Sequence, residues 1–446
     1  MQRQSSVAQT NYHFTSYTQE NGIASSTNTG IAKDSAGFIW LFSENGLTRF
    51  DGYDFKIFRS DINNPNSISS PNILSLNIDA DKNMFFQTSN SISKYNPDNG
   101  TFKKYISYQT QNYFYNWVNG APNSWLNIKG NLVYLDAKKD SAYNFSLPEG
   151  FGTNGILSLL HKNYILSICG NKYFKFDITT KKYIPSAIKY LPNFKSNNYK
   201  APLFFYNNSL GEACFYSFEG YFVYNEKENV FNQKIASDTK EENILPVTGK
   251  LMTENKFVFI VSKDGIVNFI NTETGISKTI DLKKQCNNAV KTQIITIGIY
   301  QGSNKSIWIN SVSTGIFRYN YETNTAEHFY KTENNDDNIP SNSCNYIFDE
   351  GNILWLSAPG IGLVKGEKTN ALFKPFAPVQ IHDIPATTLK RNIRKIKDFD
   401  KEHLLIISLD GAYLFNKKTN AFSDFINPVD QKSFLQQGAL GDAGIS

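Results

Sequence analysis

The residue types that could do chemistry are present, but their spacing does not favour catalysis or metal binding. No histidine lies in a His-Glu-x-x-His pattern or beside a serine in a nucleophile-elbow context. The cysteines form no Cys-x-x-Cys pair, and none has a histidine at zinc-ligand spacing. The sequence therefore predicts no catalytic residue, no metal site and no cofactor, and it predicts core thiols rather than ligands. The residues concerned are His13, His161, His328, His382, His403, Cys169, Cys214, Cys286 and Cys344.

Binding chemistry is more apparent in the aromatic segment 112–117, which reads Asn-Tyr-Phe-Tyr-Asn-Trp. Strand alternation places Tyr113, Tyr115 and Trp117 on one face of this segment. Aromatic faces stack against the apolar side of sugar rings, so these three residues are candidates for a ligand site. The alternative, which the high burial of aromatic residues favours, is that they fill the space between neighbouring sheets.

A polar connection supplies the remaining candidates for binding. Arg59 and Asp61 begin the long connection 59–66, and the segment 331–338 is its counterpart later in the chain. Connections carry binding residues more often than the packed strands between them. Most such connections are simply solvated, and that reading stays open here.

Composition and charge exclude two classes of partner. The formal charge of +5 is small for 446 residues, and no basic block of the kind that holds nucleic acid occurs. No apolar run approaches the roughly 18 residues that a membrane-spanning helix needs. The sequence therefore predicts no nucleic-acid contact and no membrane span within these residues.

The elements that position these residues are short strands in a repeating unit. A motif of two strands joined by a tight turn recurs about every 45 residues, and it is clearest at 37–51, 306–320 and 352–364. In the first copy, Asn45-Gly46 tolerates the positive φ of such a turn. Most units then end in an aromatic residue followed by Asp or Asn, whose side chain starts the next turn. A repeat of this length made of strands predicts an all-β protein, a β-propeller of four-stranded blades.

The count of units predicts how the chain is divided. Nine units exceed the usual four to eight blades of one ring. We therefore expect a disordered edge at 1–11, a seven-bladed propeller over 12–331, and two blades of a second, truncated propeller over 332–446. A single ring of eight or nine blades is the alternative. The strand 12–17 precedes the first unit and is expected to complete the seventh blade, which hides an open edge.

Trp40 marks the position that defines the repeat. Phe85 and Phe259 occupy the same position in other units, while Ile165 and Leu405 fill it with aliphatic side chains. A core position tolerates this range of apolar shapes, whereas a sugar platform would need an aromatic face. We therefore expect Trp40 to pack between blades.

These units resemble the two-component regulator propeller repeat. The matching segments are Asp34-Ser-Ala-Gly-Phe-Ile-Trp40, Gly46-Leu-Thr-Arg-Phe-Asp-Gly52 and Ile339-Pro-Ser-Asn342. The start of the chain is similar to the mature N-terminus of hybrid two-component sensors of Bacteroidetes. That family carries two seven-bladed propellers in the periplasm, followed by a membrane helix and a histidine kinase, and its members characteristically sense glycan fragments.

The resemblance implies a periplasmic sensor region that binds an oligosaccharide and is not itself an enzyme. The signal peptide, the membrane anchor, the kinase and the homodimer contacts of the full-length sensor are expected in parts missing from this chain. Two alternatives remain. One is a propeller that docks another protein without a small ligand, and the other is a propeller lyase or hydrolase.

Overall fold

The computed structural model describes residues 12–107, 115–118, 124–128, 131–149, 156–169, 172–184, 189–190, 204–217, 220–236, 249–254, 256–261, 263–274, 276–286, 290, 292–332, 338–369, 393–408, 411–419 and 421–424. The chain divides into two compact units, Met1–Lys368 and Thr369–Ser446. Strands dominate both units, and the one described α-helix is the single turn α1 (Leu282–Gln285). The prediction of an all-β protein is confirmed.

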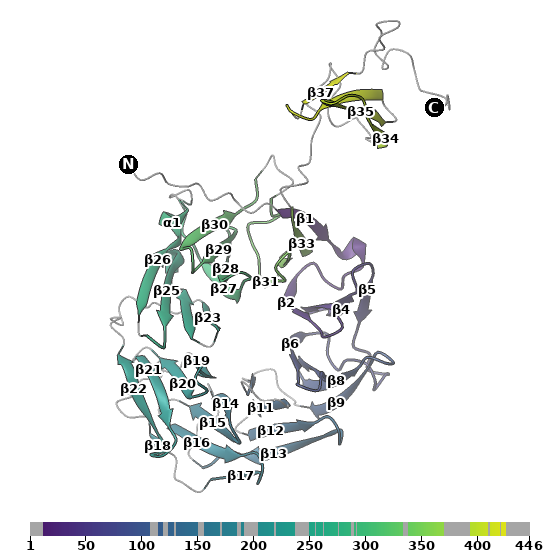
Figure 1. Cartoon of the computed structure of the whole chain (residues 1–446). Coiled ribbons are helices and arrows are strands. Elements are labelled where there is room, and N and C mark those ends of the chain that lie inside the picture. Colours follow the sequence, from purple (N-terminus) through teal and green to yellow (C-terminus); the bar gives the residue numbers. More distant parts are fainter. Residues whose placement is uncertain are drawn as a thin grey trace, which may run out of the picture. The chain divides into compact units, whose positions relative to one another are not determined.

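The described residues of the first unit form eight antiparallel sheets, which we call blades 1 to 8 in chain order (Figure 1). Blade 8 takes its fourth strand from the start of the chain, and blade 4 has one additional strand. Blades 1 to 4 consist of β2 (Asn28–Lys33), β3 (Ile39–Ser43), β4 (Gly46–Phe50) and β5 (Phe55–Phe58); β6 (Ile73–Ile78), β7 (Met84–Thr88), β8 (Ser91–Asn96) and β9 (Thr101–Ser107); β10 (Tyr115–Trp117), β11 (Ser124–Ile128), β12 (Asn131–Asp136) and β13 (Ser141–Ser146); and β14 (Leu157–His161), β15 (Tyr164–Cys169), β16 (Lys172–Asp177), β17 (Lys182–Tyr183) and β18 (Lys189–Tyr190).

The second half of the unit repeats the same order of strands. Blades 5 to 8 consist of β19 (Phe204–Asn207), β20 (Ala213–Ser217), β21 (Gly220–Asn225) and β22 (Val230–Ala236); β23 (Gly249–Thr253), β24 (Phe257–Val261), β25 (Ile266–Asn271) and β26 (Ser277–Asp281); β27 (Thr296–Gln301), β28 (Ser306–Ser311), β29 (Ile316–Asn320) and β30 (Thr325–Phe329); and β31 (Tyr346–Asp349), β32 (Ile353–Ala358), β33 (Gly362–Lys368) and β1 (Tyr12–Tyr17). The described residues of the second unit form one four-stranded sheet, β34 (Ile393–Asp398), β35 (His403–Ser408), β36 (Gly411–Asn416) and β37 (Ala421–Asp424).

Local turn chemistry explains where the strands end. Gly46 has φ +126°, and a Cβ there would lie 2.8 Å from the carbonyl oxygen of Phe58, so this turn needs glycine. At the ends of third strands, a side-chain oxygen accepts hydrogen bonds from backbone N–H groups two and three residues later. Asp51 does so in blade 1, and Asp177 does so in blade 4. The turns predicted from the repeat are confirmed at these positions.

Apolar clusters join each blade to the next and close the first unit on itself. One cluster joins blades 1 and 2, and corresponding clusters follow through to blades 7 and 8. A last cluster packs Leu41 of blade 1 against Trp355 and Leu363 of blade 8. Because blade 8 contacts blade 1, the eight sheets form a closed β-propeller.

The strand β1 completes blade 8 and not blade 7, which corrects the predicted closure. It pairs with β33 from Tyr12 opposite Lys368 to Tyr17 opposite Leu363 (Figure 1). Gly362 has φ +116°, and a Cβ there would lie 2.5 Å from the carbonyl oxygen of Tyr17. This contact repeats that of Gly46 with Phe58, so Tyr17 occupies the outer-strand position of its blade. The prediction that 12–17 closes the ring holds, but the blade is a different one.

The boundary predicted at residue 331 is corrected as well, because the first compact unit extends to Lys368. Ile339 begins the segment interpreted as a fresh propeller start, yet it is 2% exposed in the cluster shared by blades 7 and 8. The Ile-Pro-Ser-Asn segment therefore precedes the eighth blade of this unit and does not mark the start of a second propeller. The eight-bladed alternative describes this unit.

Trp40 is fully buried, as predicted for a residue that packs between blades. Its ring contacts Phe58 of its own blade and Phe86 and Tyr95 of blade 2, with ring centroids 5.1 to 5.6 Å apart. Its indole nitrogen donates to Asp34 Oδ2 at 2.7 Å. The Asp-x-x-Gly-x-x-Trp motif therefore supports the core.

Candidate functional site

A groove on blade 5 is the candidate site in the described part of the chain. Its volume is about 480 Å³, and its walls come from the turn after β14, the turn between β19 and β20, and the strands β21 and β22. We call it the blade 5 groove. It is lined by His161, Lys162, Leu210, Gly211, Glu212, Val223, Tyr224, Asn225, Glu226, Lys227, Asn232 and Lys234.

A hydrogen-bonded network links blade 4 to blade 5 at one end of this groove. His161 is 4% exposed, and its ring nitrogens lie 2.9 Å from Asn207 Oδ1 and 2.6 Å from Glu226 Oε1. The other carboxylate oxygen of Glu226 accepts from Lys162 Nζ at 2.7 Å. The hydrogen bonds from Lys162 and then His161 hold the pKa of Glu226 below its usual range. This end of the groove is therefore fixed and already neutralised.

The turn between β19 and β20 offers polar groups to the groove beside an exposed apolar side chain. Asn208 Oδ1 accepts from the backbone N–H groups of Leu210 and Glu212 at 3.0 and 2.9 Å, which fixes the turn. Leu210 is 75% exposed. Glu212 Oε2 accepts from the Asn208 amide at 3.0 Å and retains its second oxygen for other donors. Hydroxyl groups of a ligand would find acceptors here, next to an apolar surface.

The strand β22 contains a bulge at Lys234. Tyr221 pairs with Ile235 and Phe222 pairs with Gln233, so Lys234 has no partner in the register. Such bulges redirect side chains and are common beside binding sites. Among the described residues, neither Lys227 nor Lys234 forms an ion pair. Two lysines of the groove are thus available to an anion.

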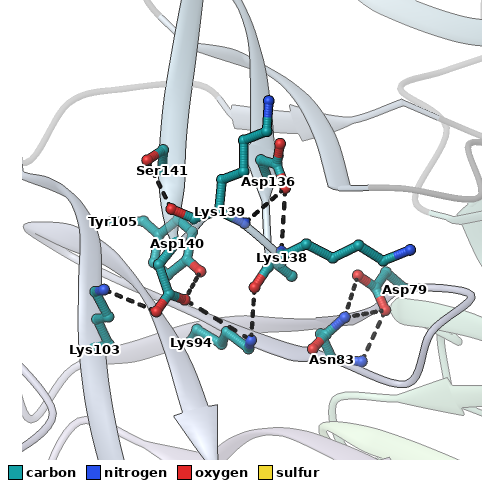
Figure 2. A network of polar contacts seen from close by, with 11 residues as sticks. Asp79, Asn83, Lys94, Lys103, Tyr105, Asp136, Lys138, Lys139, Asp140 and Ser141 are labelled. Atoms are coloured by element: carbon teal, nitrogen blue, oxygen red, sulfur yellow. Dashed lines mark hydrogen bonds and ion pairs between the residues drawn. The ribbon is translucent and has the colours of Figure 1, made fainter.

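A bulge of the same kind occurs in blade 2, where Tyr105 of β9 has no partner in the register. Polar contacts connect this part of blade 2 to blade 3 (Figure 2). Asp140, in the turn after β12 of blade 3, accepts from Tyr105 at 2.6 Å and from Lys103 at 2.9 Å. Lys94 Nζ lies 4.0 Å from the same carboxylate and donates to the Ala137 carbonyl at 3.2 Å. The hydrogen bonds from Tyr105 and Lys103 hold the pKa of Asp140 below its usual range. We call this set of contacts the blade 2–3 clamp.

The residues predicted to bind a ligand lie elsewhere, and the structure does not gather them into one site. Tyr113 lies outside the described residues, and of Tyr115 only the backbone, paired with Ile128, is described. Trp117 is half-buried, packs against the cluster shared by blades 2 and 3, and donates to Ser75 Oγ at 3.5 Å. That position agrees with the alternative of packing between blades.

Arg59 and Asp61 are exposed at the start of the predicted connection. Arg59 donates to the Asn45 carbonyl at 3.1 Å, and the Asp61 carboxylate accepts from the Asn63 N–H at 2.9 Å. Arg59 therefore contacts the turn between β3 and β4, and Asp61 stabilises its own turn. As ligand contacts, they and the aromatic residues remain predictions.

Sequence reasoning missed the groove, because its walls come from separate segments of blades 4 and 5. His161 and Glu226, for example, lie 65 positions apart in the chain and meet only in the folded structure. No pattern within one segment indicates such a site.

The described residues add little chemistry beyond the groove. They contain no group of three or more His, Cys, Asp and Glu residues that could hold a metal ion, and no helix long and apolar enough to cross a membrane. Burial raises the pKa of the Cys214 and Cys344 thiols to about 12, which is typical of unreactive core cysteines.

Comparison with known proteins identifies a relative in sequence and solved structures with similarity to this chain. No family model matches the chain. A segment of 59 residues is 37% identical to a histidine kinase of Formosa agariphila, and this match covers 13% of the chain and 4% of the kinase.

Two solved structures illustrate the fold. The extracellular domain of a hybrid two-component system of B. thetaiotaomicron has 14% identity and a TM-score of 0.45, and the match covers 94% of this chain and 50% of that one. The computationally designed protein Ika8 has 13% identity and a TM-score of 0.54, and the match covers 81% of this chain and all of the designed one. The chain thus spans about half the length of the B. thetaiotaomicron domain. It is a β-propeller protein in which a short segment is similar in sequence to part of a histidine kinase, in agreement with its resemblance to two-component sensors.

Proposed function

We propose that this chain is the extracytoplasmic, ligand-sensing region of a hybrid two-component sensor and that it recognises a glycan fragment. The observation that carries the proposal is the sequence match to a histidine kinase in a chain that folds as a β-propeller. In this proposal the region lies in the periplasm. The kinase, the membrane anchor and the contacts of a homodimer belong to other parts of the full-length sensor.

The blade 5 groove supports the glycan part of the proposal. Its volume of about 480 Å³ lies within the usual range of ligand sites, roughly 300 to 1,000 Å³. Glu212 and Asn225 offer oxygen and amide groups to sugar hydroxyls, and Leu210 offers an apolar surface to a ring face. The predicted residues Arg59, Asp61, Tyr113, Tyr115 and Trp117 form a second candidate region for the same ligand.

Calorimetric titration of the whole chain with a panel of neutral and acidic oligosaccharides tests this proposal. We expect at least one of them to bind and to raise the midpoint of thermal unfolding, because a ligand that binds only the folded state stabilises it. The oligosaccharide should be recovered unchanged by mass spectrometry, since a sensor does not turn its ligand over. If no oligosaccharide of the panel binds, the glycan part is wrong. If the oligosaccharide is cleaved, the lyase or hydrolase alternative replaces it.

One observation favours the alternative of a protein-docking propeller. Ile295, Ile297 and Val312 are 51%, 39% and 45% exposed, and the Val312 N–H donates to the Ile295 carbonyl at 2.9 Å. Adjacent exposed apolar side chains are typical of a surface that binds another protein. In that case Ile297→Asp should abolish association with a protein partner, and no oligosaccharide of the panel should bind.

A further inference from the structure

His161 lies between two hydrogen-bond acceptors at the junction of blades 4 and 5. It ends β14 and is 4% exposed, with Nδ1 2.9 Å from Asn207 Oδ1 and Nε2 2.6 Å from Glu226 Oε1. The amide of Asn207 is fixed in this orientation, because its Nδ2 donates to the Leu160 carbonyl at 2.9 Å. The pKa of Glu226 lies below its usual range, so its carboxylate is ionised and carries no proton to donate. Both ring nitrogens of His161 therefore face oxygen atoms that only accept.

His403 in the second unit shows the other arrangement. Its Nδ1 lies 3.0 Å from the carboxylate of Asp400, and its Nε2 lies 3.0 Å from Asn416 Nδ2. The Oδ1 of Asn416 accepts from the backbone N–H groups two and three residues later, which fixes the amide nitrogen toward the ring. An amide nitrogen only donates, so a ring with a single proton satisfies both contacts. His161 needs two ring protons for the same purpose and then carries a positive charge.

We propose that His161 is a pH-sensitive switch that joins blades 4 and 5 when doubly protonated and releases Glu226 when it loses one proton. A neutral ring keeps one N–H group, so one of its two acceptors then faces a lone pair. Asn207 cannot turn its amide nitrogen toward the ring without losing its hydrogen bond to Leu160. The Glu226 side chain is 42% exposed, so water is an alternative partner for it. The neutral ring therefore keeps Asn207 and gives up Glu226.

The charged and titratable groups around the ring come from both blades. Glu226 and Tyr224 of blade 5 contact it, the latter with ring centroids 6.3 Å apart. Lys162 of blade 4 binds the other oxygen of Glu226, and Lys175 Nζ lies 4.9 Å from the centre of the Tyr224 ring. The two lysines disfavour a further positive charge, whereas the carboxylate in direct contact favours it. Tyr164 lies opposite His161 in the register, and Glu212, Lys227 and Lys234 also line the groove.

The proton balance gives the sign of the pH dependence. A histidine in an unfolded chain loses its charge near about pH 6.5. The folded chain binds more protons than the unfolded chain at this position, so raising the pH weakens the folded state. The stabilisation is complete below about pH 6.5 and is lost at higher pH, as the folded ring gives up its proton. The blade 5 groove changes at the same end and over the same range, because His161, Lys162 and Glu226 line it.

The first test is NMR spectroscopy of the whole chain with isotope-labelled histidine, in which the shifts of the ring nitrogens report the protonation of each. The signals that are lost in His161→Gln and in His403→Gln identify the two rings. We expect both ring nitrogens of His161 to be protonated at neutral pH. On titration, His161 should keep its second proton to a higher pH than His403. A His161 ring with one unprotonated nitrogen at neutral pH would overturn the proposal.

Glu226→Gln distinguishes a proton switch from a contact that is independent of charge. The amide nitrogen of glutamine donates to a neutral ring, so this variant needs only one ring proton. Between about pH 6 and 8, the unfolding midpoint of the first unit should fall by about 2 °C less in this variant than in the unchanged chain. Asp400→Asn is the matched control, because it makes the corresponding change beside His403, and it should leave that fall unaltered. Equal falls in Glu226→Gln and the unchanged chain, measured by differential scanning calorimetry, would also overturn the proposal.

Discussion

At the scale of single residues, the repeat uses its most recognisable side chains for packing. Trp40 and Trp308 are both fully buried, and each donates its indole N–H to an aspartate at 2.7 Å. Trp40 uses Asp34 of its own blade, whereas Trp308 uses Asp349 of the next blade. The hydrogen bond is thus kept even where the local aspartate of the motif is replaced. Because these conspicuous residues are buried, a ligand would have to contact other positions of the repeat.

Trp40→Ala should destabilise the protein by about 3 to 5 kcal/mol, because it leaves a large cavity between blades 1 and 2. The free energy of unfolding from a denaturant titration measures the effect. Tyr53→Ala is the control, since Tyr53 is 92% exposed, and it should change the stability by less than about 0.5 kcal/mol. A midpoint for Trp40→Ala equal to that of the unchanged protein would contradict the packing role.

At the scale of elements, the closing strand β1 determines whether blade 8 has an open edge. Tyr12 is 3% exposed and contacts Trp308 and Phe329 of blade 7, so this strand also joins two blades. Tyr12, opposite Lys368 at the end of β33, therefore lies in the interface between blades 7 and 8.

Removal of residues 1–18 should lower the stability of the first unit by about 3 kcal/mol or more. The loss combines the removal of three packed aromatic side chains, Tyr12, Phe14 and Tyr17, with the exposure of the β33 edge. Thermal unfolding followed by circular dichroism measures it. Removal of residues 1–11 alone, which leaves β1 intact, should have little effect. A synthetic peptide of residues 12–18 should restore part of the loss, and an unchanged midpoint after the longer deletion would refute the closure.

How far the sequence predicts this fold depends on which interactions are local. The turn at Gly46, the side-chain caps at Asp51 and Asp177 and the burial of Trp40 follow from neighbouring residues, and all four were predictable. The blade that β1 completes depends on pairs from Tyr12 with Lys368 to Tyr17 with Leu363, which are 356 to 346 positions apart, and a pattern in one segment does not encode them. The groove escaped prediction for a related reason, since it brings together His161 of blade 4 and Glu226 of blade 5, which lie 65 positions apart in the chain.

At the scale of the whole molecule, ring closure makes the first unit one cooperative body. Leu41 of blade 1 and Trp355 of blade 8 share a cluster, and Ser357 Oγ donates to the Asn28 carbonyl of blade 1 at 3.0 Å. Lys33 and Glu350 form an ion pair between the same two blades. Each blade of the ring contacts a neighbour on both faces, so removal of one blade exposes two apolar faces at once.

This closure predicts different outcomes for two shortened chains. A chain of residues 1–368 should unfold in a single transition with the midpoint that the first unit has in the full chain. A chain of residues 1–331 retains blades 1 to 7 but loses β31, β32 and β33, so Leu41 and Trp308 lose their partners in blade 8. We expect it to unfold at least 10 °C lower or to aggregate, because a loss of several kcal/mol shifts the midpoint of a large domain by about that much. Differential scanning calorimetry, with dye binding as a measure of exposed apolar surface, distinguishes the two chains. Equal midpoints would instead support a seven-bladed ring that ends near residue 331.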